Sequence, residues 1–508
     1  MKAMWMLDVA REQCLTMDHL RQFAGFTREA GYDAIGLYLE HRFAYPSSPG
    51  THGLGAITPS MAQSLAREFP DIEIIPFVNL LGHFEGWIYT AAGERYAEEP
   101  FLGLQACPTN PEFHQMVKSL LDDVIDAFPS HVIHIGGDET YQLGRCPQCR
   151  AAVEHYERVA GRDGKAALYA DFMAPLARYV IERGRRPAVW GDMFIDHPQA
   201  LATLPKETLI FDWQYFSGCR ETSSRFLEAG FEVVGCPALQ TYNALWMHLL
   251  ESEQNVRDVA SDCRDLGVAG VCVTTWEYAL FGAVDTLLPS VAAARTLIDQ
   301  PDAPDHHMVR GYGPQGEAWA RLMGVELPKL GAPFEHSKRR SSLKVRLLLQ
   351  ADPFLAWRYH RQELCGETGE AALALFEKAL CDAPDEATKG VTLFSRACVE
   401  FVQQAEKASA AYRDRRPAEA IAALAPLRRL FEDLEQIAVK SHHRIGGSLA
   451  DIERCRVARS AVETAMRRVR DHGDGSMGYL PSFSHLTHPR FMPHDQGAWW
   501  RVNRWAAD

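Results

Sequence analysis

Residues 130–140 read Ser-His-Val-Ile-His-Ile-Gly-Gly-Asp-Glu-Thr, which joins a strand to a pair of acids. The β-branched run through Ile133 predicts a short buried strand. The two glycines after it allow the backbone to turn sharply and a ligand to approach closely. The stretch therefore predicts a buried strand that ends in two adjacent carboxylates, Asp138 and Glu139.

This acid pair has two interpretations. Adjacent carboxylates repel each other, and apolar surroundings readily keep one of them protonated near neutral pH. A proton donor beside an ionised neighbour is what cleavage of a glycosidic bond requires. Asp138 and Glu139 could instead cap the following helix, because acids are favoured at helix N-termini. The spacing of the two residues leaves both interpretations open.

The composition of the 508 residues is ordinary for a soluble globular protein, with 47% hydrophobic and 23% charged residues. A net charge of −13 argues against nucleic acid as a partner and disfavours anionic membranes. No apolar stretch approaches the roughly 20 residues of a membrane span. Residues 1–8 reach an acid too early for a signal peptide. With twelve cysteines, most of them scattered singly along the chain, these features predict a reduced, cytoplasmic protein.

One close cysteine pair, Cys146 and Cys149, follows the acid pair. A single Cys-x-x-Cys supplies half of a structural zinc site, and the sequence has no second pair at zinc spacing. We therefore expect a local thiol pair in a loop, and neither a metal site nor a cofactor.

From residue 4 to about 300, eight short apolar runs alternate with amphipathic helical stretches. Runs that are apolar on both faces and separated by helices predict a (β/α)8 TIM-type barrel. An open doubly wound sheet is the alternative, but no Gly-x-Gly-x-x-Gly turn follows the first run. The runs are 4–10, 34–39, 72–79, 131–135, 187–191, 208–213, 231–236 and 268–274, and the helical stretches are 15–30, 61–68, 112–128, 166–183, 220–229 and 253–266.

Functional groups of such a barrel lie at the carboxyl ends of its strands. Carboxylates, one arginine and three tryptophans at these ends predict a sugar pocket, since sugar rings stack on aromatic faces and sugar hydroxyls bind charged groups. Each tryptophan taken alone is better explained as core packing. The candidates are Arg11, Glu40, His83, Asp138, Glu139, Trp190, Trp213, Tyr242, Trp276 and Glu277, and Asn79, Glu85 and Asp192 also stand at strand ends.

The composition changes after the barrel, which we expect to cover residues 1–305. Residues 306–336 are rich in Pro and Gly and predict a connecting segment with a short helix near 317–323. Residues 337–472 predict an α-helical domain that packs as an antiparallel bundle. Residues 473–508 form an aromatic- and proline-rich tail, too short for a core of its own, that packs on the barrel or on a partner chain. The expected bundle helices are 338–350, 371–380, 387–413, 417–438 and 445–469.

The motif His134-x-Gly136-Gly137-Asp138-Glu139 resembles the signature of glycoside hydrolase family 20, the β-N-acetylhexosaminidases. Residues 8–11, Asp-Val-Ala-Arg, look like the Asp-x-(Ser/Ala)-Arg start of that family. The tryptophans after strands five and six, the tyrosine after strand seven and the Trp-Glu pair after strand eight fall in the order of the family. The resemblance covers roughly residues 4 to 300.

The resemblance implies an exo-acting, retaining and substrate-assisted hydrolase that releases terminal N-acetylglucosamine or N-acetylgalactosamine from glycans or glycoconjugates. The 2-acetamido oxygen of the substrate attacks the anomeric carbon, so no protein nucleophile is needed. Asp138 would orient the acetamide, and Glu139 would be the general acid and base. The resemblance further implies that Tyr242 holds the acetamide oxygen, that Arg11 binds sugar hydroxyls, that Trp190, Trp213 and Trp276 wall the acetamide and ring, that Glu277 reaches the outer hydroxyls, and that Glu40 and His83 set the proton affinity of Glu139.

Departures from the family pattern leave the preference between gluco and galacto sugars open. Glu40 and His41 stand where many members have paired aspartates, and Trp276 and Glu277 are adjacent where one residue commonly separates them. Two other functions are alternatives. One is a metal-dependent barrel hydrolase with His83, His134, Asp138 and Glu139 as ligands. The other is a sugar-binding barrel without catalysis.

The tail suggests a homodimer. Members of the family commonly carry a small domain before the barrel, whereas the first strand here begins near residue 4. The helical domain could carry the aromatic tail to the mouth of a partner's barrel. In that arrangement Trp499 or Trp500 would line the outer part of the pocket. In the alternative arrangement, the tail tryptophans only seal the bundle against the barrel.

Overall fold

The computed structural model describes residues 1–10, 13–100, 102–161, 163–239, 245–276, 284–331 and 353–473. Eight parallel strands form a closed barrel, because the last of them pairs with the first. The predicted TIM-type barrel and all eight predicted strands are confirmed. In barrel order the strands are β1 (Lys2–Asp8), β2 (Ala34–Tyr38), β3 (Glu73–Phe77), β6 (Val132–His134), β7 (Arg186–Trp190), β8 (Leu209–Trp213), β9 (Glu232–Cys236) and β11 (Gly270–Thr275), and the short β10 (Ala238–Leu239) pairs with β11.

The strands are buried on both faces, which explains why their sequences are apolar without alternation. Neighbours along one strand belong to different clusters. Trp5 packs under the surrounding helices, whereas Met6 points into the barrel interior. Phe77 and Phe211 fill the interior with it. The barrel is therefore a packed core, and any ligand must bind at its rim.

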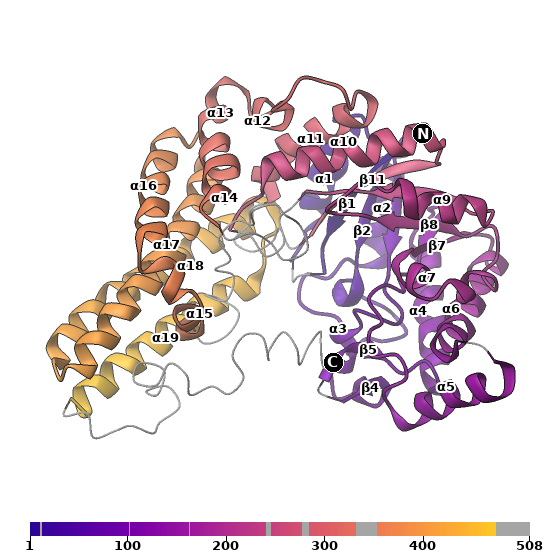
Figure 1. Cartoon of the computed structure of the whole chain (residues 1–508), viewed down its shortest axis with the longest axis horizontal. Coiled ribbons are helices and arrows are strands. Elements are labelled where there is room, and N and C mark those ends of the chain that lie inside the picture. The colour runs from indigo at the N-terminus through magenta and orange to yellow at the C-terminus, as the bar shows by residue number, and fades with distance from the viewer. Residues whose placement is uncertain are drawn as a thin grey trace.

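Helices surround the barrel on its outer side (Figure 1). Most begin at a polar cap that their sequences provide: Thr16 forms a capping box at the first helix, and Asn110 and Asp163 cap two others. The six predicted helices are confirmed, and α5, α7, α8 and α11 are additional. The helices are α1 (Met17–Glu29), α2 (Pro59–Glu68), α4 (Pro111–Ala127), α5 (Pro147–Ala160), α6 (Gly164–Glu182), α7 (Asp192–Asp196), α8 (Pro198–Leu201), α9 (Arg220–Glu228), α10 (Leu249–Leu266) and α11 (Val284–Asp299).

An antiparallel hairpin, β4 (Ala97–Glu99) and β5 (Leu102–Ala106), is inserted between β3 and α4. It binds the loop after β3, because Phe84 N–H donates to Leu104 O at 2.7 Å and Ala106 N–H donates to Leu81 O at 3.0 Å. Short helical turns lie nearby: η1 (Glu40–Arg42), α3 (Glu85–Ile88) and η2 (Glu94–Tyr96). The sequence had not predicted this hairpin, which braces one side of the barrel mouth.

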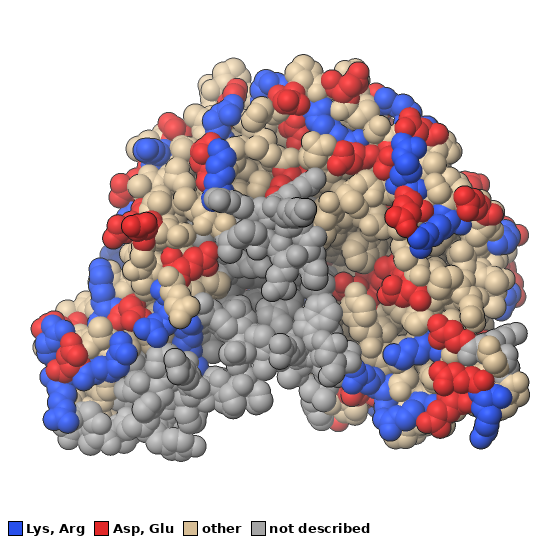
Figure 2. Space-filling model, in the orientation of Figure 1, with Lys and Arg blue, Asp and Glu red and all other residues tan. Residues whose placement is uncertain are grey.

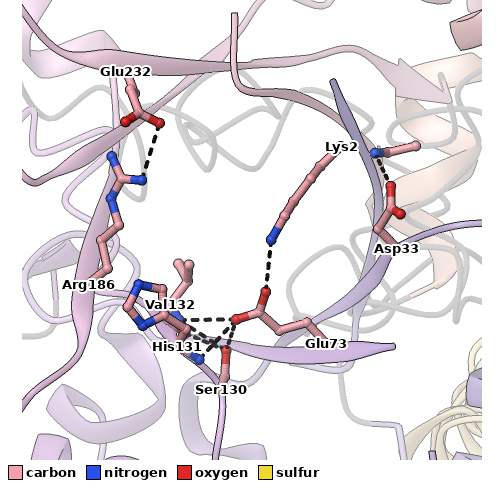
Figure 3. Close-up of polar contacts among 9 residues, drawn as sticks. Lys2, Asp33, Glu73, Ser130, His131, Val132, Arg186 and Glu232 are labelled. Atoms are coloured by element: carbon pink, nitrogen blue, oxygen red, sulfur yellow. Dashed lines mark hydrogen bonds and ion pairs between the residues drawn. The ribbon is translucent and has the colours of Figure 1, made fainter. Parts of the chain in front are cut away.

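Polar contacts hold the opposite, amino-terminal rim of the barrel together (Figure 3). One oxygen of Glu73 accepts hydrogen bonds from the Ser130 hydroxyl at 2.9 Å and from the backbone N–H groups of residues 131 and 132. Its other oxygen lies 3.6 Å from Lys2 Nζ. Arg186 pairs with Glu232 at 3.2 Å further around the rim. These bonds join the starts of neighbouring strands, and their role at this end is structural.

Residues 306–336 were predicted to be a connecting segment with a short helix near 317–323, and the described part of this segment contains more helix than that. Residues 307–329 are helical almost throughout, as α12 (His307–Arg310), α13 (Gly313–Arg321), the π-helix η4 (Leu322–Glu326) and α14 (Leu327–Lys329). Trp319 is fully buried between Trp246, 4.6 Å away between ring centroids, and Thr392, which accepts its indole N–H at 2.9 Å. The segment therefore forms a packed layer between the barrel and the helical domain.

The helical domain lies beside the barrel (Figure 1). The end of α18 and the turn after it contact the loop that follows β1 and the start of α1. Cys14 N–H donates to Gly446 O at 3.2 Å, and His19 Nε2 lies 3.2 Å from His443 O. The predicted helix 338–350 and the tail from residue 474 lie outside the described residues. The described helices are α15 (Pro353–Leu364), which was not predicted, α16 (Glu367–Asp382), α17 (Glu386–Arg413), α18 (Pro417–Ile445) and α19 (Leu449–Asp471).

Charge is mixed on the described part of one face of the molecule. Figure 2 shows basic and acidic side chains interspersed across the described part of one face, with no extended basic patch there. This pattern agrees with the net charge of −13. Among the described helices, none combines the length and the apolar character that crossing a bilayer requires.

Candidate active site

The described candidate residues gather at the carboxyl ends of the strands, as predicted. Glu40 follows β2, His83 follows β3, Asp138 and Glu139 follow β6, and three tryptophans end or follow later strands. Arg11, Tyr242, Glu277 and Trp499 lie outside the described residues.

His83 contacts both members of the acid pair. Its Nε2 lies 3.2 Å from Glu139 Oε2 and 3.6 Å from Asp138 Oδ2, and only 10–13% of each of the three side chains is exposed. Asn79 donates from Nδ2 to Asp138 Oδ1 at 3.1 Å and to the Tyr38 hydroxyl at 2.7 Å. Asp138 is therefore held from two sides in a buried position.

The backbone is strained at the residues that form this cluster. Glu40, His83 and Glu139 have φ angles of 40°, 48° and 46°, and they are three of the five non-glycine residues with positive φ in the described part of the chain. Such conformations cost of order 1–3 kcal/mol each and persist where the surrounding structure enforces them. Glu139 is fixed by its backbone N–H, which donates to Asp192 Oδ2 at 2.9 Å. The gathering of strain here indicates that side-chain placement is under functional constraint.

Burial and mutual contact shift the titration of these groups. Burial, aided by the neighbouring Glu139, raises the pKa of Asp138 to about 6, although His83 opposes the shift. Burial lowers the pKa of His83, but the charges of Asp138 and Glu139 outweigh it and raise that pKa to about 10. Burial also raises the pKa of Asp192 well above its usual range. At neutral pH the cluster thus favours an imidazolium at His83 next to an ionised Asp138, while Asp192 resists ionisation.

The two glycines of the motif are required by the turn. Gly136 and Gly137 have φ of 72° and 96°, a region that other residues rarely adopt. A Cβ atom at Gly136 would lie 2.0 Å from Asn79 Oδ1, and one at Gly137 would lie 2.6 Å from the Tyr169 hydroxyl. The sharp turn predicted from the sequence is confirmed, and it brings Asp138 against Asn79.

The three tryptophans differ in position: one is buried beneath the site and two lie at its rim. Trp190 is fully buried and packs against His134, with ring centroids 4.4 Å apart, inside the barrel. Trp276 is partly exposed, lies 4.9 Å edge-on from Tyr38, and donates its indole N–H to the Tyr215 hydroxyl at 2.8 Å. Trp213 is also partly exposed, beside Tyr215. Trp190 is thus a core residue beneath the site, whereas Trp213 and Trp276 present ring surface at the rim.

Several site residues had no predicted role. Asn79, Asp192 and Glu85 stand at strand ends in the sequence, but only the structure joins the first two to the acid pair and places the third beside His83. Tyr38 had been only the last part of an apolar run, and no sequence signal separates it from core tyrosines. Position after a strand was the one signal that could have marked the other three.

The described residues do not support the four-ligand metal alternative. His134 is buried, stacked on Phe77 with centroids 4.4 Å apart, and its Nδ1 accepts the backbone N–H of Gly136. It does not join His83, Asp138 and Glu139 in a metal-suited cluster. Within the described ranges, two groups have candidate ligand atoms within 4.8 Å of one another: Glu40, His83 and Glu85 at the mouth, and Glu98, Cys107, Cys146 and Cys149 outside it.

Comparison with known proteins finds a family match over part of the chain. Residues 69–286 match the model described as glycosyl hydrolase family 20, catalytic domain. The chain is 30% identical over 141 residues to the β-hexosaminidase of Akkermansia muciniphila, covering 25% of this chain and 28% of that protein. It is 25% identical over 244 residues to human hexosaminidase D, covering 43% of this chain and 48% of that protein. The chain thus spans less than half the length of either curated relative.

Two solved structures also match, at lower sequence identity. The β-N-acetylhexosaminidase of Bacteroides fragilis has a TM-score of 0.47 and 17% identity, over 64% of this chain and 71% of that one. The exo-β-N-acetylglucosaminidase of Vibrio harveyi, in complex with N-acetylglucosamine, has a TM-score of 0.49 and 18% identity, over 62% of this chain and 57% of that one. Residues 69–286, which include the acid pair at the mouth of the barrel, thus match the catalytic domain of glycosyl hydrolase family 20.

Proposed function

We propose that the protein is an exo-acting β-N-acetylhexosaminidase that removes terminal, non-reducing N-acetylglucosamine or N-acetylgalactosamine from glycans or glycoconjugates. The observation that carries this proposal is the buried Asp138–Glu139 pair at the end of a barrel strand, with His83 in contact with both carboxylates. Two adjacent acids with different surroundings can take different roles in one reaction.

In this proposal the substrate supplies the nucleophile. Asp138, held by Asn79, accepts the acetamide N–H and orients the acetamide oxygen toward the anomeric carbon. That oxygen forms a bond to the anomeric carbon while the bond to the leaving oxygen breaks, and Glu139 gives its proton to the leaving oxygen. Water then opens the resulting oxazolinium ion, and Glu139 takes a proton from that water. Two displacements at one carbon retain its configuration.

His83 is proposed as a positioning residue for both acids. Its imidazolium balances the charge of Asp138, so that Asp138 can stay ionised at neutral pH next to Glu139. Glu40 and Glu85, whose oxygens lie within 4.8 Å of a His83 ring nitrogen, belong to the same charged group. Together they are proposed to set the proton affinity of Glu139, a role that the resemblance implied for Glu40 and His83.

Substrate binding is proposed to use the aromatic rim. Trp213 and Trp276 present ring faces on which the sugar and its acetamide can stack, and Trp190 supports them from below. Tyr242 is proposed to hold the acetamide oxygen, Arg11 to bind the inner hydroxyls with its planar fork, and Glu277 to reach the outer hydroxyls.

Substrates without the 2-acetamido group test the proposal directly. We expect kcat/KM for an aryl β-glucoside to be at least about 100-fold below that for the aryl N-acetyl-β-glucosaminide, because an intramolecular nucleophile is worth several orders of magnitude. Comparable values for the two glycosides would contradict substrate assistance. No turnover of either, together with binding of N-acetylglucosamine, would favour the sugar-binding barrel, and loss of turnover in a chelator would favour the metal-dependent one.

The pH profile of His83→Asn tests the proposed charge balance. Asparagine tolerates the left-handed backbone at this position. In the parent protein kcat/KM should fall as the pH drops through about 6, where Asp138 takes up a proton. Removing the imidazolium removes an interaction that lowers the pKa of Asp138, so the acidic limb should move to higher pH. His131→Asn, exposed at the opposite rim, is the control. If the acidic side of the pH profile of kcat/KM is the same in His83→Asn as in the parent protein, His83 does not have the proposed role.

We further propose a cytoplasmic homodimer in which the tail, with Trp499, completes the outer pocket of the partner. The tail carries large aromatic side chains whose burial is worth roughly 1.5–3 kcal/mol each. Truncation after Gly473 should yield monomers with a raised KM while the barrel keeps its circular dichroism spectrum. Light scattering measures the oligomeric state, and steady-state kinetics measures KM. A truncated chain that is monomeric like the parent and has an unchanged KM would refute the proposal.

A further inference from the structure

Four potential metal ligands meet where the β4–β5 hairpin approaches the start of α5. Cys107 Sγ lies 3.5 Å from Cys149 Sγ and 3.6 Å from Cys146 Sγ, and Glu98 Oε2 lies 3.1 Å from Cys149 Sγ. All four ligand atoms lie within 4.8 Å of one another. The sequence showed only the Cys146–Cys149 pair, because the other two residues lie about 40 and 50 positions earlier in the chain.

The sulfur spacing fits a tetrahedral ion. Zinc–thiolate bonds of about 2.3 Å at tetrahedral angles place two sulfurs roughly 3.8 Å apart. The observed separations of 3.5 and 3.6 Å are close to this value. All three cysteines are free. One disulfide, with sulfurs about 2.05 Å apart, would leave the third thiol over, whereas one cation can bind all three.

The surrounding backbone orients the donors. Glu98 Oε1 accepts the N–H groups of Arg145 at 2.7 Å and Cys146 at 2.9 Å, so Oε2 is left to face the sulfurs. Cys149 N–H donates to Cys146 Sγ at 3.3 Å, and Cys146 caps the N-terminus of α5. A helix N-terminus and backbone donors stabilise a thiolate, and bonds of this kind fix ligands around a metal.

Burial makes a cation the natural partner of this cluster. Glu98 is 1% exposed, Cys107 and Cys149 are buried, and Cys146 is half-buried. Among the described residues, no lysine or arginine forms an ion pair with Glu98. A carboxylate buried without a countercharge is costly, and coordination of a metal removes that cost.

We propose that Glu98, Cys107, Cys146 and Cys149 form a structural zinc site. Four protein ligands that close the coordination sphere are typical of structural rather than catalytic zinc. Three thiolates favour zinc over the hard cations calcium and magnesium. This site is independent of the proposed hydrolase activity and lies outside the acid cluster.

The zinc would join the two loops that carry the acid cluster. The hairpin holds the loop of His83 through β5. Gln142, between Glu139 and Cys146, accepts the backbone N–H groups of Leu104 and residue 105 at 2.9 and 3.2 Å. Glu98 lies in β4 and Cys107 directly follows β5, while Cys146 ends the loop of Glu139 and Cys149 lies in the first turn of α5. The ion would therefore fix the position of one loop relative to the other.

Metal analysis of the full-length reduced protein tests the site. Protein made in zinc-supplemented medium should contain about one zinc per chain by mass spectrometry of the element. Cys107→Ser and Cys149→Ser should each lose most of that zinc. Cys219→Ser is the matched control, because Cys219 is also buried, 3.7 Å from the Sγ of Cys263, but belongs to no metal-suited cluster in the described ranges. It should keep the full zinc content.

A second measurement covers variants that fail to fold. Cobalt added to the metal-free parent protein should give the intense visible bands of tetrahedral Co²⁺ and a thiolate charge-transfer band. Zinc removal should raise amide hydrogen exchange selectively in residues 97–107 and 140–149. Absence of bound zinc together with a featureless cobalt spectrum would overturn the proposal. So would a disulfide within the cluster of the freshly purified protein, or zinc retained by both Cys107→Ser and Cys149→Ser.

Discussion

Glu139→Gln is expected to lower kcat on an N-acetylhexosaminyl disaccharide by about 10²- to 10⁴-fold, the usual worth of general acid–base catalysis. Glutamine keeps the size and the hydrogen bonding of the side chain but cannot donate a proton to a leaving alkoxide. The backbone bond from residue 139 to Asp192 does not involve the substituted side chain. Binding of the sugar should therefore be retained, so that the loss falls on kcat and not on KM.

The dependence on the leaving group makes this prediction specific. An aryl glycoside whose phenolate leaves without protonation needs little help from Glu139 in the first step. Its rate should fall much less than that of the disaccharide, and comparison of the two substrates by steady-state kinetics measures the difference. An unchanged rate on the disaccharide, or an equal loss on both substrates, would remove Glu139 from the role of general acid.

Asp138→Asn should reduce turnover of both substrates, by roughly 10³-fold, in the range found when a group that stabilises transition-state charge is removed. The neutral amide cannot stabilise the positive charge that develops on the acetamide nitrogen as the oxazolinium ion forms. Because this step precedes any effect of the leaving group, an activated aryl glycoside should not rescue the rate. If Asp138→Asn turned over such a substrate at the wild-type rate, the substrate-assisted mechanism would be contradicted.

The same substitution should leave the fold intact, which separates lost chemistry from lost structure. Burial raises the pKa of Asp138 to about 6, so the folded protein binds this proton more tightly than the unfolded chain does. The ionised form therefore costs stability above pH 6, and a neutral residue avoids that cost. Asp138→Asn should melt at the same temperature as the parent protein or higher at pH 7.5. Thermal unfolding at that pH is the measurement.

Local sequence was enough to predict the barrel and the place of its chemistry. The strands from β1 to β11 are apolar on both faces, a pattern that only a sheet covered by helices explains. Asp138 and Glu139 stand directly after one of these strands, and parallel strands of a barrel all end at one rim. Helices α1 and α4 were predicted correctly because their polar caps and apolar faces are also local features of the sequence.

Elements whose stability depends on distant partners were missed. The hairpin β4–β5 is short, and its strands are stabilised by bonds to Leu81 and Phe84 and by Gln142. In α11, Pro289 interrupts the helical pattern, although the helix is buried against α10 and β11. Residues 307–329 contain enough Pro and Gly to suggest a linker, but buried packing around Trp319 makes them helical. In each case tertiary contacts outweigh local propensity.

The sequence by itself determined the periodicity of apolar residues, and with it the barrel, the bundle and the acid pair at a strand end. Only the tertiary structure decided which residues, distant in the sequence, lie in contact with one another. His83 meets two carboxylates from a loop more than fifty residues away, and Glu98 and Cys107 join a cysteine pair that looked like half a site. Periodicity is a property of neighbouring residues and can be read along a chain. Charge balance and metal coordination depend on distances of a few ångströms across the fold, which no local pattern encodes.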